Sequence, residues 1–436
     1  MWNDAAQRLP REQLRAEQLH RLQTQVERVR AHVPWYRERM SQAGVEPGAI
    51  RSLNDLARLP FTAKAHLREG FPFGLSAVPR TELVEVHMSS GSTGKPVVDA
   101  YTRGDLALWG DLMGRTLDMG GVGPGDIVQN SFGYGLFTGG FGVHYGAETL
   151  GALVVPISSG NTRRQLETMV DFGTTTLTCT PSYALYLAEY AREQGIDPRV
   201  LGLRRGFFGA EPWSEAMRQQ IEDDWDIEAF DIYGLTEIIG PGVGAECSEH
   251  DGLHVFEDHF YPEVVDPDTG VAVPDGTEGE LVLTTLTREG TPLLRYRTRD
   301  VTYLIDEPCP CGRTSRRIHR LMGRTDDMLI IRGVNIFPQQ IEEVLLRAQA
   351  VAPHYRLVVD RHGSMDTLLV EVEMTMEAFS DDVGDILALE RRIEADLKSA
   401  LGIMVTCALV NPKSVERAET GKVVRVIDRR EVRTHV

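Results

Sequence analysis

The strongest signal in the chain is the stretch Ser89-Ser90-Gly91-Ser92-Thr93-Gly94-Lys95-Pro96. Gly91 and Gly94 let the backbone approach phosphate oxygens, because no Cβ stands in the way. The hydroxyl groups between them add hydrogen-bond donors, and Lys95 adds a cation. The spacing is not that of a Walker A loop, which needs Ser or Thr where Pro96 stands. The stretch therefore predicts a phosphate-binding turn between two strands, with a plain flexible turn as the alternative.

Short apolar runs alternate with helical stretches on both sides of this loop, from about residue 80 to residue 300. Four such runs are 127–130, 153–157, 176–180 and 206–209. This alternation is typical of an α/β fold with buried sheets. Before it, apolar residues recur at three-to-five-residue steps and predict a helical start over 11–44.

The pattern changes after Gly323. The remaining segment predicts a compact α+β unit with helices near 338–349 and 385–401 and with strands near 355–360, 366–374 and 404–410. We therefore expect a large multi-sheet α/β domain over residues 1–325. A small α+β domain over residues 326–436 should follow it.

Composition excludes several classes of protein. The 436 residues carry a formal net charge of −18, which disfavours general binding to nucleic acid or to an anionic membrane. The chain contains no apolar run of the roughly 18 residues that a membrane span needs. It also lacks a basic-then-apolar signal pattern after Met1, so we expect a cytoplasmic location. Five cysteines in a long chain do not suggest a disulfide framework.

The loop at 89–96 resembles the phosphate loop of the acyl-adenylate-forming (AMP-binding) superfamily. Further elements that resemble this superfamily follow in its order: Tyr233-Gly234-Leu235-Thr236-Glu237, Arg295-Tyr296-Arg297-Thr298-Arg299-Asp300, Gly323-Arg324-Thr325-Asp326-Asp327 and Gly421-Lys422. The resemblance implies an adenylate-forming fold whose small C-terminal domain is mobile.

Within that superfamily, the chain is most similar to phenylacetate–coenzyme A ligases, over nearly its whole length. The stretches that carry this similarity include Val33-Pro34-Trp35-Tyr36, Leu59-Pro60-Phe61-Thr62, His144-Tyr145-Gly146-Ala147-Glu148 and Ile331-Arg332-Gly333-Val334-Asn335-Ile336-Phe337-Pro338. The resemblance implies a ligase that activates an aromatic acid with ATP and passes it to coenzyme A. One alternative is an enzyme with the same adenylation step but an amine, hydroxyl or carrier-protein acceptor. Another is a catalytically silent protein that only binds an aryl acid. The sequence leaves open whether two copies of the chain form a homodimer.

The resemblance also assigns the residues of the first half-reaction. Lys422 would contact the carboxylate and α-phosphate oxygens, where the reaction needs fixed positive charge. Thr236 would donate to the α-phosphate, and Glu237 would hold Mg²⁺, which prefers carboxylate and phosphate oxygens. Asp300 would accept from both ribose hydroxyls.

The remaining nucleotide contacts follow from the same motifs. The phosphates would meet Ser90, Gly91, Ser92, Thr93, Gly94 and Lys95. The adenosine part would meet Ala210, Glu211, Pro212, Asp231, Tyr233 and Gly234, while Arg324 would contact ribose or phosphate. Asp326 matches the hinge about which the small domain would rotate for the second half-reaction.

Aromatic residues and glycines interleave over residues 131–145. Glycines let the backbone pass close to a flat ligand, and aromatic rings supply faces and edges. We expect Tyr134, Phe137 and Phe141 to line the acid pocket, with ordinary core packing as the alternative. Phe141 and Ser159 depart from the family pattern, so a substituted benzoate competes with phenylacetate as the acid.

A tight thiol pair, Cys309 and Cys311, lies shortly before the predicted hinge. Together with Cys247 and His254 it would make a closed tetrahedral zinc site that braces the loop before the hinge. His250 or His259 could replace His254. The alternative is a set of reduced cysteines in a loop.

Overall fold

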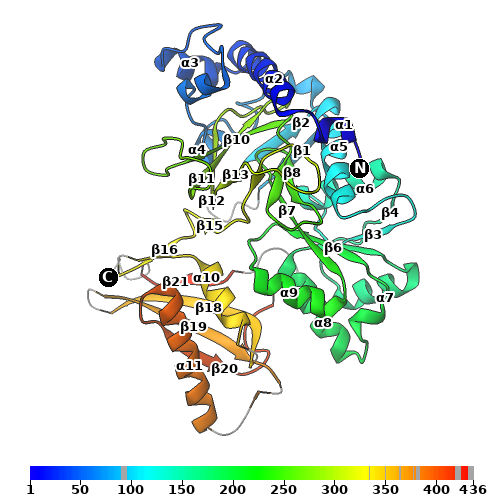
Figure 1. The fold of residues 1–436 in the computed structure, drawn as a ribbon, viewed down its shortest axis with the longest axis vertical. Coiled ribbons are helices and arrows are strands. Elements are labelled where there is room, and N and C mark those ends of the chain that lie inside the picture. Colours follow the sequence, from blue (N-terminus) through cyan, green and yellow to red (C-terminus); the bar gives the residue numbers. More distant parts are fainter. Residues whose placement is uncertain are drawn as a thin grey trace. The chain divides into compact units, whose positions relative to one another are not determined.

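The computed structural model describes residues 1–89, 96–332, 334–348, 350–362, 365–376, 378–379, 383–417 and 424–430 (Figure 1). The predicted phosphate-loop residues Ser90 to Lys95 and the predicted lysine Lys422 lie outside these ranges. The chain forms two compact units. The first comprises Met1–Cys179, Val200–Ala210 and Glu228–Leu321, and the second comprises Thr180–Arg199, Glu211–Ile227 and Met322–Val436.

A nine-stranded sheet organises the first unit, with strand order β13-β14-β9-β8-β7-β6-β5-β3-β4. Its strands are β3 (Ile127–Asn130), β4 (Leu153–Val155), β5 (Thr176–Cys179), β6 (Arg205–Gly209), β7 (Glu228–Leu235), β8 (Gly240–Glu246), β9 (Leu253–Val255), β13 (Leu304–Ile305) and β14 (Arg317–Ile318). The strands from β4 to β7 run parallel, and the others pair antiparallel. The four predicted apolar runs are β3 to β6, so the α/β prediction is confirmed.

Helices connect the parallel strands, as a parallel sheet requires. They are α6 (Thr138–Leu150), α7 (Thr162–Phe172), α8 (Pro181–Glu193) and α9 (Glu215–Trp225). A short hairpin of β1 (Glu85–Met88) and β2 (Val98–Tyr101) flanks the phosphate-loop residues. The strands β10 (Phe260–Val265), β11 (Gly279–Thr285) and β12 (Tyr296–Thr302) form an antiparallel sheet.

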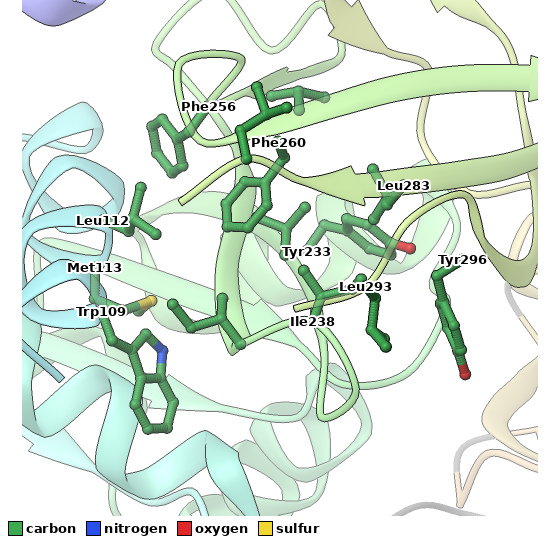
Figure 2. Close-up of a cluster of buried hydrophobic side chains, with 14 of the residues drawn as sticks. Trp109, Leu112, Met113, Tyr233, Ile238, Phe256, Phe260, Leu283, Leu293 and Tyr296 are labelled. Atoms are coloured by element: carbon green, nitrogen blue, oxygen red, sulfur yellow. The ribbon is translucent and has the colours of Figure 1, made fainter. Parts of the chain in front are cut away.

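The core of this unit lies between helix α5 (Arg103–Met119) and the strands. Thr102 caps the helix by accepting a hydrogen bond from the Asp105 N–H. Figure 2 shows Leu112 and Met113 of α5 on the side that faces Phe256 and Ile238. Full burial of each such side chain contributes about 1.5–3 kcal/mol. Because this core fixes β7 and β8, it also fixes the loop between them, which carries Glu237.

The N-terminal segment is helical, as predicted, but in pieces: α1 (Asp4–Gln7), α2 (Arg11–His32), α3 (Pro34–Gln42), the short 3-10 helices η1 (Leu53–Arg58) and η2 (Arg80–Glu82), and α4 (Lys64–Glu69). The predicted helical start over 11–44 breaks at Val33, whose backbone is extended. The residue before a proline disfavours the helical conformation, and Pro34 then opens α3.

The second unit contains α8, the 3-10 helix η3 (Pro198–Val200, whose last residue belongs to the first unit), α9 and the C-terminal elements. The latter are β15 (Gly323–Arg324), β16 (Leu329–Ile331), β17 (Val334–Ile336), α10 (Pro338–Leu346), β18 (Val351–His362), β19 (Met365–Met374), α11 (Val383–Leu401), β20 (Thr406–Val410) and β21 (Val426–Asp428). A sheet of order β20-β19-β18-β21 packs with α10 and α11, which confirms the predicted α+β character. Within the described ranges, each helix is too short or too polar to cross a membrane.

Candidate active site

The predicted adenine and ribose residues meet directly. The Tyr233 hydroxyl donates to Asp300 Oδ2 at 2.6 Å, and both residues are buried. Tyr233 stands on β7, and Asp300 on β12, in a different sheet. A side chain at Gly234 would strike the Gly240 carbonyl oxygen, only 2.0 Å from an ideal Cβ. Glycine is therefore needed where the end of β7 passes against β8.

Thr236 and Glu237 follow β7 directly, and both are buried. Lys64, the first residue of α4, places its Nζ 3.2 Å from Glu237 Oε1. A carboxylate in this position suits Mg²⁺ together with phosphate oxygens. Lys64 was missed from the sequence, although it follows closely on the family-like stretch Leu59-Pro60-Phe61-Thr62.

Hydrogen bonds to the start of β12 position the segment before Lys64. The Thr62 N–H donates to the Arg295 carbonyl at 3.0 Å, and the Arg297 N–H donates back to the Thr62 carbonyl at 2.9 Å. The Thr62 hydroxyl donates to the Leu294 carbonyl at 2.7 Å. The strand that carries Asp300 therefore also positions the segment that leads to Lys64.

The arginines of the Arg295–Asp300 motif anchor this strand. Arg295 pairs with Glu263 at 3.0 Å, and its guanidinium lies 4.0 Å from the centre of the Phe61 ring. Arg297 hydrogen-bonds Glu280. Arg299, just before Asp300, has a φ of 70°. A non-glycine residue in this region costs about 1–3 kcal/mol and persists only where its surroundings impose it.

The remaining predicted adenosine contacts divide between the two units. Ala210 directly follows β6 and has a φ of 70°. Asp231 is buried on β7, and its backbone N–H donates to Glu246 Oε2 at 2.8 Å. In the second unit, Glu211 accepts a hydrogen bond from the Ser182 N–H at 2.8 Å, at the start of α8, and Pro212 is half-buried.

Two of the three predicted acid-pocket residues contact each other. The Tyr134 and Phe141 rings lie 5.3 Å apart, edge to face. The Tyr134 hydroxyl accepts from Asn130 at 2.8 Å, and burial raises the pKa of Tyr134 to about 12. Phe137 precedes α6 as its N-cap, and its ring lies against Gly139, where a Cβ would come within 2.7 Å of it. All three predicted side chains are half-buried.

Further polar residues surround Phe141 that the sequence did not single out. The rings of His87 and Tyr145 lie 5.3 and 6.0 Å from the Phe141 ring. The Tyr145 hydroxyl donates to Glu85 Oε2, and His87 Nε2 lies 2.7 Å from Glu85 Oε1. Burial alone would raise the pKa of the Glu85 carboxyl, but the hydrogen bonds from His87 and Tyr145 lower it below its ordinary value.

The four predicted zinc ligands come together. The ligand atoms of Cys247, His254, Cys309 and Cys311 all lie within 4.8 Å of one another. The Sγ atoms of Cys247 and Cys309 are 3.7 Å apart, and Cys311 Sγ lies 3.4 Å from His254 Nε2. Such a Cys₃His set, with Cys311 half-buried and the other three residues buried, fits a structural zinc ion.

The alternative histidines are engaged elsewhere: His250 contacts Glu228, and His259 contacts Thr287. The other ring nitrogen of His254 lies 3.2 Å from the Ser315 hydroxyl, a contact that would orient the ring for a metal. Burial alone would raise the pKa of the Cys311 thiol, but hydrogen bonds involving His254 and the Arg313 N–H lower it to about 5. A thiolate is the form that binds metals.

The remaining predicted residues lie outside the described ranges or in the second unit. The phosphate-loop residues stand between Ser89 and Val97 in the sequence. These two residues are hydrogen-bonded to each other, because the Ser89 N–H donates to the Val97 carbonyl at 3.0 Å. In the second unit, Arg324 pairs with the predicted hinge residue Asp326 at 2.9 Å.

Comparisons with known proteins agree with this arrangement. The family model of AMP-binding enzymes matches residues 11–285, and that of the AMP-binding enzyme C-terminal domain matches residues 333–430. The phenylacetate–coenzyme A ligase of Thermus thermophilus is 48% identical and aligns over 99% of this chain and 100% of its own length. That of Escherichia coli is 45% identical over 97% and 96%.

Solved structures give the same result. A 2-hydroxyisobutyryl-CoA ligase in its postadenylation state is 31% identical, with a TM-score of 0.93 over 98% of this chain and 92% of its own. The same enzyme in its thioesterification state gives a TM-score of 0.73 over the same shares. By its sequence and fold, the chain belongs to the AMP-binding enzymes and, within them, to the phenylacetate–coenzyme A ligase family.

Proposed function

We propose that this AMP-forming acid–coenzyme A ligase activates an aromatic carboxylic acid as an acyl-adenylate and transfers the acyl group to coenzyme A. The observation that carries this proposal is the hydrogen bond between Tyr233 and Asp300, with Glu237 following the same strand β7. This arrangement brings together the Tyr233 ring for adenine, the Asp300 carboxylate for ribose and the Glu237 carboxylate for the metal.

The first half-reaction brings two anions together, the carboxylate of the acid and the α-phosphate of ATP. Mg²⁺, when bound, would neutralise phosphate charge. Glu237 would hold it, and the Thr236 hydroxyl would donate to the α-phosphate. Asp300 would accept from the ribose hydroxyls and so fix the direction of the α-phosphate. Lys422 would supply the cation at the oxygens where negative charge develops.

The second half-reaction brings the coenzyme A thiol to the same carbon. We propose that a C-terminal domain over residues 326–436 turns about Asp326 against a domain over residues 1–325. Supporting this, the 2-hydroxyisobutyryl-CoA ligase matches with TM-scores of 0.93 and 0.73 in its two states, so that relative itself changes shape between them. A homodimer and a cytoplasmic location stay predictions from the sequence.

For the acid, the half-buried rings of Tyr134 and Phe141 support an aryl group. The named relatives at 45% and 48% identity are phenylacetate–coenzyme A ligases, which favours phenylacetate. Ser159 Oγ lies 3.3 Å from the position of a Cβ on Gly133, next to Tyr134. Its hydroxyl group would suit a polar ring substituent, so substituted benzoates belong in the test.

The test is ATP–pyrophosphate exchange with phenylacetate, benzoate and their amino and hydroxy derivatives. We expect exchange with an aryl acid and, on addition of coenzyme A, formation of its thioester. Exchange followed by acyl transfer only to amines would show that the acceptor is an amine and not coenzyme A. Acid binding without any exchange would show a silent binding protein and contradict the proposal.

We further propose that Cys247, His254, Cys309 and Cys311 hold one structural zinc ion. The loop that carries the thiol pair is joined to the N-terminal segment, because the Thr314 N–H donates to the Gln7 carbonyl at 3.0 Å. A closed four-ligand site leaves no position for substrate, so the metal would stabilise this junction and take no part in the reaction. Elemental analysis should find about one zinc per chain. Less than half an equivalent would contradict the site.

A further inference from the structure

The Phe141 ring, which is predicted to line the acid pocket, contacts two polar rings that a third residue holds together. His87 of β1 and Tyr145 of α6 have ring centres 5.3 and 6.0 Å from that of Phe141. Glu85 of β1 accepts from the Tyr145 hydroxyl through Oε2 at 2.7 Å, and its Oε1 lies 2.7 Å from His87 Nε2. One carboxylate therefore binds both polar neighbours of Phe141.

The His87 ring is enclosed by aromatic side chains. It is 1% exposed, and it meets the rings of Tyr101 and Trp109 edge to face at 5.4 and 5.5 Å. Trp109 is a core residue of α5 that Figure 2 labels. Water cannot replace a lost partner of so deeply buried a ring, so the contact of His87 with Glu85 is costly to break.

Strand β1 is also bound to the loop that precedes α6. The Met88 N–H donates to the Leu136 carbonyl at 2.8 Å, and His87 Nδ1 lies 3.3 Å from the same oxygen. The same loop carries Tyr134, whose ring lies 5.3 Å from Phe141, edge to face. His87 therefore contacts both segments from which the predicted acid-pocket residues come.

The backbone of α6 has little room to move at Phe141. A Cβ on Gly142, the next residue, would lie 2.7 Å from Pro241 and 2.8 Å from the Trp109 ring. Tyr145 follows Phe141 by four residues, so the two side chains are neighbours on one face of the helix. The freedom that remains at this position is the turning of the Phe141 side chain, and Glu85 restrains the two rings beside it.

We propose that Glu85, acting through His87 and Tyr145, is a specificity-determining residue that fixes the Phe141 ring and so limits the enzyme to single-ring aryl acids. This rests on the proposed function, in which Phe141 lines the acid pocket. A larger acid would have to push Phe141 against one of its two polar neighbours and break a hydrogen bond to the carboxylate. Loss of such a bond corresponds to about a tenfold change in affinity or more.

The experiment measures ATP–pyrophosphate exchange by full-length Glu85→Gln with the fastest single-ring acid of the panel and with its naphthyl counterpart. The amide carries no charge and has one acceptor oxygen where the carboxylate has two, so it cannot hold both rings as before. We expect kcat/KM for the naphthyl acid, relative to the single-ring acid, to rise about tenfold. The KM for ATP should stay within about twofold, because the nucleotide contacts are distant from the change.

Two further variants separate this role from general damage. Tyr145→Phe removes only the hydroxyl that Glu85 accepts and should raise the same ratio. Combining it with Glu85→Gln should add nothing, because the two changes break the same contact. Val86→Thr is the matched control, since Val86 is 40% exposed and points to the other face of β1. It should leave the ratio unchanged.

An unchanged ratio in both Glu85→Gln and Tyr145→Phe would overturn the proposal. So would an equal loss of exchange with the two acids together with a higher KM for ATP, because that pattern shows a damaged fold. Wild-type protein without exchange on any aryl acid would instead overturn the proposed function.

Discussion

The ammonium group of Lys64 lies 3.2 Å from Glu237 Oε1, although 172 residues separate them. Lys64 is 39% exposed, whereas Glu237 is 7% exposed. A partly exposed cation therefore covers the carboxylate that is proposed to bind Mg²⁺. When MgATP binds, we expect the ammonium group to move from the carboxylate to a phosphate oxygen.

Replacing Lys64 by Met should slow adenylation about 10- to 100-fold, because the site loses one cation near the phosphates. Lys64→Arg should restore part of the rate. Calorimetric titration with magnesium pyrophosphate should show weaker binding to the Met variant. Arg68→Met, on the same helix, is the control, and equal effects at both positions would show that only general charge matters.

Replacing Lys422 by Ala should slow adenylate formation by roughly 10²–10³, the cost of losing one transition-state donor. Thioester formation from preformed adenylate should change much less, because that step no longer involves the α-phosphate attack. Single-turnover measurements of the two half-reactions test this. Equal loss of both would remove Lys422 from its assigned role.

Replacing Tyr233 by Phe should weaken ATP binding, because Asp300 loses the hydroxyl that orients it at 2.6 Å. Hydrogen bonds to charged groups are worth about 1.5–3 kcal/mol, so the KM for ATP should rise about tenfold or more. Asp300→Ala should have the larger effect, since it also removes the ribose contact. Unchanged KM values in both variants would contradict the ribose assignment.

The half-buried phenol of Tyr134 should stay protonated in any ordinary assay, because its pKa is raised to about 12. The folded state then holds this proton more tightly than the unfolded chain, whose tyrosine pKa is about 10. Stability from Tyr134 is therefore present below pH 10 and lost between pH 10 and 12. Measured by urea unfolding, the free energy of unfolding of Tyr134→Phe should fall less steeply between pH 10 and 12 than that of the wild type. The same pH dependence in both proteins would contradict the shifted pKa.

Replacing Cys309 by Ser should release zinc and lower the free energy of unfolding by at least about 2 kcal/mol, as loss of a metal site does. A zinc-sensitive dye and urea unfolding measure the two effects. Cys407→Ser is the control, because Cys407 is also buried but lies outside the four-ligand cluster. Full zinc retention in Cys309→Ser would argue against its role as a ligand.

The apolar runs could be located from the sequence because buried parallel strands are rich in hydrophobic residues, such as Ile127-Val128 in β3 and Phe207-Phe208 in β6. Pro34 could have marked the break between α2 and α3, since proline opens a helix more readily than it continues one. The zinc ligands could be proposed because thiols and imidazoles have few other reasons to cluster. Their grouping still needed the fold, because His254 lies 57 residues from Cys311.

By itself, the sequence determined the fold class, the order of the motifs and the kind of chemistry, since strand periodicity and loop composition act over short stretches of chain. Only the tertiary structure joined Lys64 to Glu237, Glu85 to Tyr145 and Arg417 to Glu189. These contacts depend on how distant segments pack. An ordinary charged residue such as Lys64 or Glu189 carries no local pattern that names its partner, and its role emerges only when burial leaves a particular opposite charge within reach.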